Sequence, residues 1–60
     1  MFKIEVTSPE GKTRLLPTEY RYPDDAMAQA ERIWLRSDGS VLACVSVIEQ
    51  DGTTYADYEH

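Results

Sequence analysis

The sequence reads VLACVSVIEQDGTTYADY from residue 41 to residue 58, with Asp51-Gly52 between two largely apolar stretches. Asp-Gly in this setting is a strong signal for a β-hairpin, because both residues tolerate the positive φ angles of a two-residue type I′ turn. Residues 41–49 are rich in Val and Ile and predict a strand. Residues 53–58 predict the strand that returns beside it.

The turn also predicts which residues of this hairpin face each other. A two-residue turn sets Gln50 opposite Thr53, Ile48 opposite Tyr55, Val47 opposite Ala56 and Val45 opposite Tyr58. One face then carries Ala43, Val45, Val47, Ala56 and Tyr58, and the other carries Leu42, Cys44, Ile48 and Tyr55. Both faces are apolar in this register.

The N-terminal part of the chain predicts a second hairpin. Residues 2–7 alternate between apolar and polar side chains, as a half-buried strand does. A turn follows, in which Pro9 presets φ and Gly11 is free to take a positive φ. Residues 13–16 predict an antiparallel partner strand, and a bulge at Pro17 would join it to a further extended piece over residues 18–22.

A helix is predicted between the two hairpins. Pro23-Asp24-Asp25 opens it, with Asp24 as the N-cap, and residues 26–36 contain no Gly or Pro. Its apolar stripe consists of Met27, Ala30, Ile33 and Trp34. Gly39 is the expected C-cap glycine.

Residues 1–60 are therefore expected to form a single small α+β domain in the order ββαββ. Its sheet should be mainly antiparallel and carry the helix on one face. A chain of 60 residues is too short for a second domain, and its stability is marginal.

The charge balance narrows the classes of partner. Six Lys and Arg against eleven Asp and Glu give a net charge of −5. This argues against direct binding of nucleic acid or an anionic membrane, both of which need a basic surface. The alternating N-terminus is unlike a signal peptide, and no stretch is long and apolar enough to span a membrane. With a lone cysteine, Cys44, we expect a cytoplasmic protein.

No group of residues predicts a reaction. Cys44 sits among apolar neighbours and is expected to be a buried structural cysteine, and His60 is terminal. Asp24-Asp25 is better explained by helix capping than by a metal site. Gly11-Lys12-Thr13 resembles the end of a phosphate-binding loop but lacks the earlier glycine and the following helix. We expect neither an enzyme nor a bound cofactor or metal.

Because one helix covers only one face of a sheet, apolar surface should remain on the other. This patch would consist of Leu42, Ile48 and Tyr55, and Leu15 or Leu16 could extend it. Trp34 would join it if the apolar stripe of the helix is larger than the core can accommodate. Such a patch typically marks an interface. The leading hypothesis is a protein-interaction or regulatory module that forms a homodimer or binds a larger protein. Alternatively, sheet curvature, long side chains and residues 20–22 cover the patch.

A second hypothesis rests on the acidic residues of the last strand and its turn, which are Glu49, Asp51, Asp57 and Glu59. On a folded domain they could imitate a row of phosphates and inhibit a nucleic-acid-binding protein. A solvated face that maintains solubility is the competing explanation. A role in binding a small ligand comes third, because a domain of this size offers little room for a pocket except at a dimer seam.

Overall fold

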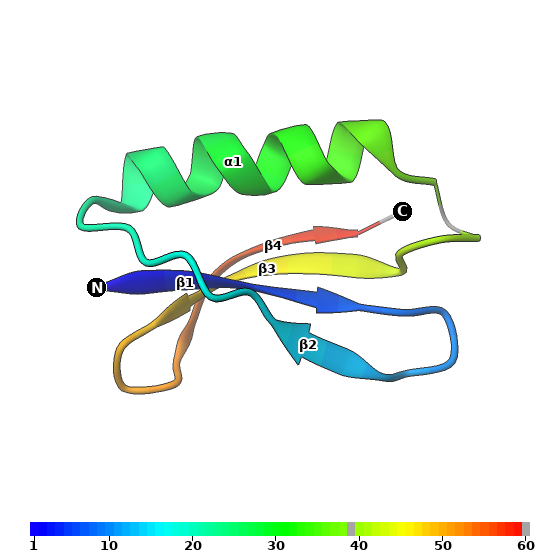
Figure 1. Cartoon of the computed structure of the whole chain (residues 1–60), viewed down its shortest axis with the longest axis horizontal. Helices are drawn as coiled ribbons and strands as arrows, with labels where there is room; N and C mark the ends of the chain where they lie inside the picture. The colour runs from blue at the N-terminus through cyan, green and yellow to red at the C-terminus, as the bar shows by residue number, and fades with distance from the viewer. Residues whose placement is uncertain (39, 60) are drawn as a thin grey trace.

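The computed structural model describes residues 1–38 and 40–59. It contains four strands and one helix: β1 (Phe2–Thr7), β2 (Thr13–Leu15), α1 (Pro23–Arg36), β3 (Cys44–Glu49) and β4 (Thr54–Glu59). The predicted α+β class and the ββαββ order are confirmed (Figure 1). No helix within the described residues is long and apolar enough to cross a membrane.

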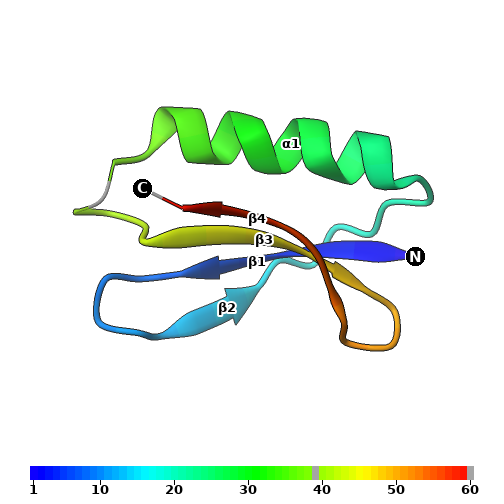
Figure 2. The same ribbon diagram turned by 180° about the vertical axis from the view of Figure 1, so that it is seen from behind.

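The four strands form one antiparallel sheet in the order β2-β1-β3-β4. The two hairpins therefore meet through their first strands, and β1 pairs with β3 along its whole length, from Phe2 opposite Glu49 to Thr7 opposite Cys44. Strands β2 and β4 are the edges. Helix α1 makes the connection between the hairpins and lies along one side of the sheet (Figures 1 and 2).

The core lies between α1 and this side of the sheet. Ile4, Val45 and Val47 are fully buried from the sheet, and Ala26 and Ala30 are fully buried from the helix. The two alanines allow the helix backbone to approach the central strands closely. The predicted helix stripe is confirmed, because Met27, Ile33 and Trp34 pack against the same cluster beside Ala30.

The helix begins two residues earlier than an N-cap at Asp24 would imply, so the prediction of Asp24 as N-cap is wrong. The N-cap is Tyr22, with φ −113° and ψ 140°, and Pro23 occupies the first helical position. A residue before proline is pushed into this extended region, and proline at the first position loses no hydrogen bond. Asp24 and Asp25 lie in the first turn, where their negative charge interacts favourably with the positive end of the helix dipole.

At the other end of the helix, Ser37 is the cap residue, and its hydroxyl donates to the carbonyl oxygen of Trp34 at 3.0 Å. The predicted cap glycine, Gly39, lies outside the described residues.

Strand β3 begins at Cys44, three residues later than predicted. The carbonyl oxygen of Asp38 accepts the backbone N–H groups of both Val41 and Leu42, each at 3.0 Å. The Asp38 carboxylate also accepts the N–H of Ser40 at 2.8 Å. A turn built on Asp38 therefore keeps Val41 and Leu42 out of the strand. The first backbone hydrogen bond to β1 is made by Ala43, whose N–H donates to the carbonyl of Thr7 at 2.8 Å.

The last hairpin turns through three residues, so the predicted two-residue turn is wrong. Glu49 donates its N–H to the carbonyl of Thr53 at 2.8 Å, and Gly52 donates to the carbonyl of Glu49 at 2.9 Å. Gly52 has φ +90°. This is the bonding of a turn followed by a positive-φ glycine, a common three-residue hairpin loop.

A β-bulge in β4 then restores part of the predicted register. Ile48 faces Thr54, whereas Val47 faces Ala56, so Tyr55 is the extra residue. The predicted pair of Ile48 and Tyr55 is therefore wrong. The pairs of Val47 with Ala56 and of Val45 with Tyr58 are confirmed.

The segment after β2 rejoins the sheet, but the predicted extended piece over residues 18–22 is reduced to a single bridge at Tyr20. Leu16 still donates its N–H to the carbonyl of Ile4 at 2.8 Å, and the chain then leaves the sheet at Pro17. It returns at Tyr20, which exchanges two backbone hydrogen bonds with Phe2, at 2.7 and 2.8 Å. This return places Glu19 beside the N-terminal end of β1.

Candidate functional site

The face of the sheet away from α1, called here the open face, consists of three rows of side chains. Residues directly opposite each other in an antiparallel sheet share a face. The central row crosses all four strands as Leu15, Glu5, Ser46 and Asp57. One flanking row holds Lys3, Ile48 and Thr54, and the other holds Thr13, Thr7, Cys44 and Glu59.

These rows correct the expectation of a continuous apolar patch. Polar or charged neighbours surround Ile48 and Leu15, because β1 and β4 contribute their polar alternate residues to this face. The alternation of β1 already contained this signal. The pattern of β3 and β4, from which the patch was predicted, does not reveal that β1 lies next to β3.

Two of the predicted interface residues, Leu42 and Trp34, belong to the core side. Both are partly buried and pack against the central cluster, and the Trp34 ring lies 6.1 Å from the ring of Tyr58. Leu42 precedes β3 and is held by the turn at Asp38, so strand alternation does not apply to it. The structure therefore does not bring either residue together with Ile48.

Tyr55 is also displaced from the predicted face. As the extra residue of the bulge it packs edge-to-face on Phe2, with ring centroids 5.4 Å apart and an interplanar angle of 74°. Phe2 packs against the core cluster, so this contact draws Tyr55 away from Ile48. Ile48 is the one predicted interface residue that lies on the open face.

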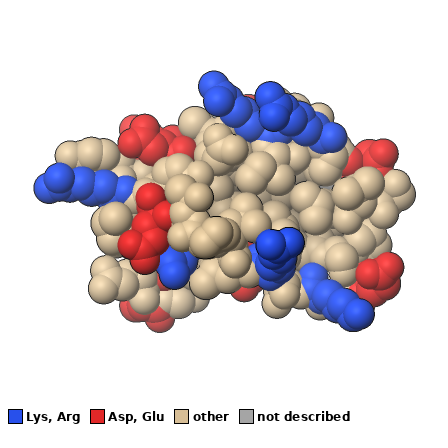
Figure 3. Space-filling view, viewed as in Figure 1, with Lys and Arg blue, Asp and Glu red and all other residues tan. Residues whose placement is uncertain are grey.

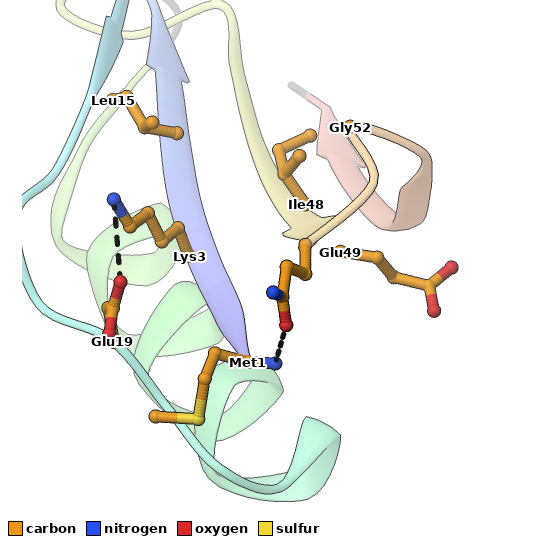
Figure 4. A pocket seen from close by; sticks show the side chains of 8 residues that line it. Met1, Lys3, Leu15, Glu19, Ile48, Glu49 and Gly52 are labelled. Atoms are coloured by element: carbon orange, nitrogen blue, oxygen red, sulfur yellow. Dashed lines mark hydrogen bonds and ion pairs between the residues drawn. The ribbon is translucent and has the colours of Figure 1, made fainter.

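A pocket of about 400 Å³ lies beside Ile48. Figure 4 shows it from close by, with Leu15 and Ile48 on either side of β1. The side chains of Met1, Leu15 and Ile48 give it an apolar part. Its volume is within the range of sites that hold a small molecule or a partner's side chain.

Charged and polar groups form the rim of this pocket. The Lys3 ammonium lies 3.6 Å from a Glu19 carboxylate oxygen, with both side chains roughly half exposed. The amino group of Met1 donates to the Gln50 side-chain oxygen at 3.3 Å (Figure 4). No sequence pattern pointed to Glu19, because only the return of Tyr20 to β1 places it there.

A second polar group crosses the middle of the open face. The Ser46 hydroxyl donates to the Asp57 carboxylate at 2.5 Å, and the Cys44 sulfur lies 3.3 Å from the same hydroxyl. Ser46 is 6% exposed although no helix covers it, because larger neighbours surround its short side chain. Cys44 is half-buried beside polar groups, so the expected apolar surroundings are wrong.

This polar group combines two potential nucleophiles, Ser46 and Cys44, with the Asp57 carboxylate that accepts the Ser46 hydroxyl. Histidine or lysine would normally activate a serine or cysteine, and none contacts Ser46 or Cys44 among the described residues. Within residues 1–38 and 40–59, no group of three or more His, Cys, Asp or Glu side chains could hold a metal ion. The terminal His60 lies outside the described residues.

The turn of the last hairpin contains an acid with a perturbed pKa. The N–H of Thr53 donates to the Asp51 carboxylate at 2.9 Å. This bond, aided by the Thr53 hydroxyl, holds the pKa of Asp51 below its ordinary value of 3.8. The role of Asp51 is therefore to stabilise the loop.

No protein-family model matches this chain, and neither the curated proteins nor the solved structures gave a match.

Proposed function

We propose that this chain is a small non-catalytic protein-binding module that docks its partner on the open face around Ile48. The observation that carries the proposal is the pocket beside Ile48, with its apolar part and charged rim, on the side of the sheet away from α1. A partner's apolar side chain would bury Ile48, Leu15 and Met1 there. Interfaces commonly have such an apolar centre within a polar rim.

The lack of a histidine or lysine in contact with Ser46 and Cys44 among the described residues supports a role without catalysis. A hydrolase or transferase needs a nucleophile, a base and an oxyanion site in one place. Ser46 and Asp57 supply only a hydroxyl and a carboxylate joined by a hydrogen bond.

The decisive variant is Ile48→Asp, with Leu35→Asp as its matched control. Both substitutions replace an aliphatic residue by aspartate and add one negative charge. Ile48 borders the pocket, whereas Leu35 is 66% exposed on α1, the element that packs on the other side of the sheet. Both variants are expected to stay folded, as checked by circular dichroism and amide NMR spectra.

Binding is then measured in two ways. Sedimentation velocity reports self-association, and immobilised wild-type and variant chains report partners captured from the native host. We expect a loss of affinity of about a hundredfold for Ile48→Asp and little change for Leu35→Asp, because a charge at the centre of an interface is desolvated. Equal binding by both variants would show that the open face is not the docking site.

A second candidate is an acidic inhibitor of a nucleic-acid-binding protein. The observation that favours it is the exposure of Asp57 and Glu59 on one face with the half-buried Glu5. Such a decoy would bind through charge alone and lose affinity steeply with salt. It would keep binding after Ile48→Asp and would be displaced by free DNA, and these two outcomes distinguish it from the first proposal.

A further inference from the structure

We infer that the open face takes a basic, extended segment of another protein with one apolar anchor residue, in preference to a second copy of this chain. This inference rests on the proposed function and adds the chemistry of the partner. Its basis is the charge on the open face and the spacing that the sheet imposes on it.

Carboxylates outnumber basic groups on the open face. Glu5, Asp57 and Glu59 belong to its rows, and none of them forms an ion pair with a Lys or Arg among the described residues. Lys3 is the one basic residue in these rows, and Glu19 already lies 3.6 Å from it. The face therefore presents unneutralised negative charge beside the pocket.

The basic side chains lie elsewhere. Figure 3 shows Lys and Arg on the outer side of α1, whose basic residues are Arg32 and Arg36, and others in the part of the molecule below the helix in this view. Helix α1 covers the opposite face of the sheet, and neither of its arginines forms an ion pair with Asp57 or Glu59 among the described residues.

This arrangement disfavours a symmetric homodimer through the open face. A two-fold axis places the same patch on both sides of the interface. The carboxylates of one copy would then approach those of the other, and like charges brought together at an interface cost affinity. A basic partner experiences attraction at the same positions.

The rows also predict the spacing of residues in the partner. Ser46 lies two residues from Ile48 along β3, and Cys44 lies four, so their rows are about 7 and 13 Å from the Ile48 row. Asp57 and Glu59 stand beside Ser46 and Cys44 in these rows. In an extended segment, residues two and four positions apart have the same spacing and point to the same side.

A segment with an apolar residue over Ile48 would therefore bring its second and fourth neighbours over Asp57 and Glu59. Lysine or arginine at those two positions satisfies both carboxylates. The hydrogen bond from the buried Ser46 hydroxyl holds one Asp57 oxygen, and the other accepts no hydrogen bond within the described part of the chain. The partner motif is thus an apolar residue with basic residues two and four positions away.

A library of random unstructured peptides, selected on the immobilised full chain, tests this motif. The chain is compared with two variants: Ile48→Asp, and the triple variant Glu5→Gln, Asp57→Asn and Glu59→Gln. The amides keep the size of the carboxylates, and the amide oxygen introduced by Asp57→Asn would still accept the Ser46 hydroxyl bond. Circular dichroism and amide NMR spectra confirm the fold of each variant, and sedimentation velocity of the wild type is run in parallel.

We expect selected peptides to carry the motif and to bind Ile48→Asp at least tenfold more weakly. The triple variant should bind them about threefold to thirtyfold more weakly, with a flatter dependence on salt. Peptides that depend on Ile48 but show no basic enrichment would overturn the partner chemistry and leave the proposed function standing. Self-association that Ile48→Asp abolishes would make a second copy the occupant, with the same consequence. If neither peptides nor self-association depend on Ile48, both proposals fail.

Discussion

The two hairpins of this protein share one loop geometry but continue from it differently. In both, three residues form the loop, the flanking residues are joined by a backbone hydrogen bond of 2.8 Å, and a glycine with φ +90° closes the turn. The glycines are Gly11 and Gly52. From this common start, β2 pairs with β1 without interruption, whereas β4 contains a bulge at Tyr55.

The difference arises from what each edge strand must bury. Without the bulge, the loop would set Asp57 opposite Val45, which is fully buried under α1. A carboxylate there would lose its hydration without a partner, which costs several kcal/mol. The bulge shifts β4 by one residue, so Tyr58 faces Val45 and Asp57 reaches the open face. The three residues of β2 are all exposed, so no such demand acts on them.

The largest difference in stability between the two edge strands should appear when a carboxylate is placed at a position of each strand that faces the helix side of the sheet. Ala56 faces Val47 and packs against the core, whereas Arg14 faces Val6 and is exposed. We expect Ala56→Asp to abolish folding of this marginal domain, while Arg14→Asp changes the free energy of unfolding by about 0.5 kcal/mol or less. Urea denaturation followed by circular dichroism measures both. Similar losses for the two variants would mean that β2 supports the core as β4 does.

A smaller effect is expected from deleting Tyr55, which makes the second hairpin continuous like the first. The three-residue loop then leads directly to Thr54 opposite Ile48 and Ala56 opposite Val47. The deletion loses the ring contact with Phe2, so the free energy of unfolding should fall by about 1 kcal/mol while the fold survives.

Cross-strand nuclear Overhauser effects between β3 and β4 check the register of this deletion variant. An unfolded variant would show that the bulge is required by β4 for a reason other than the length of the loop.

The smallest effect concerns the acids of the two loops, Asp51 and Glu10. Asp51 accepts the N–H of Thr53 and has a lowered pKa, so its ionised form stabilises the folded state. This stability is present above the ordinary pKa of 3.8 and is lost as the pH falls through the lower pKa of the folded state. The difference in stability between wild type and Asp51→Ala should therefore shrink as the pH falls below about 4.

Glu10→Ala is the matched control in acid denaturation, because in the first loop the Ser8 hydroxyl, and not Glu10, accepts the N–H of Lys12, at 3.2 Å. A difference for Asp51→Ala that stays constant through acid pH would show that the ionised carboxylate does not stabilise the loop.

Much of the fold could be predicted because its signals are local. The alternation of β1, the helix stripe ending at Trp34 and the glycine of each turn are periodic or conformational preferences of short segments. The pairs of Val47 with Ala56 and of Val45 with Tyr58 were predicted from a turn that is one residue too short, and they hold because the bulge at Tyr55 offsets the longer loop. The open face was predicted poorly. Of its proposed residues Ile48 was placed correctly, as was Leu15 as its possible extension, and Lys3 and Glu19 were missed.

The amino-acid pattern alone was enough for the class, the order of elements and the identity of the buried stripe, since these depend on side-chain periodicity within each segment. Strand order, the bulge at Tyr55 and the inward turn of Leu42 were settled only when all segments packed together. The bulge in particular follows from the need to keep Asp57 out of the core beneath α1, a demand that arises only once β4 lies beside β3. The composition of the open face follows from this packing.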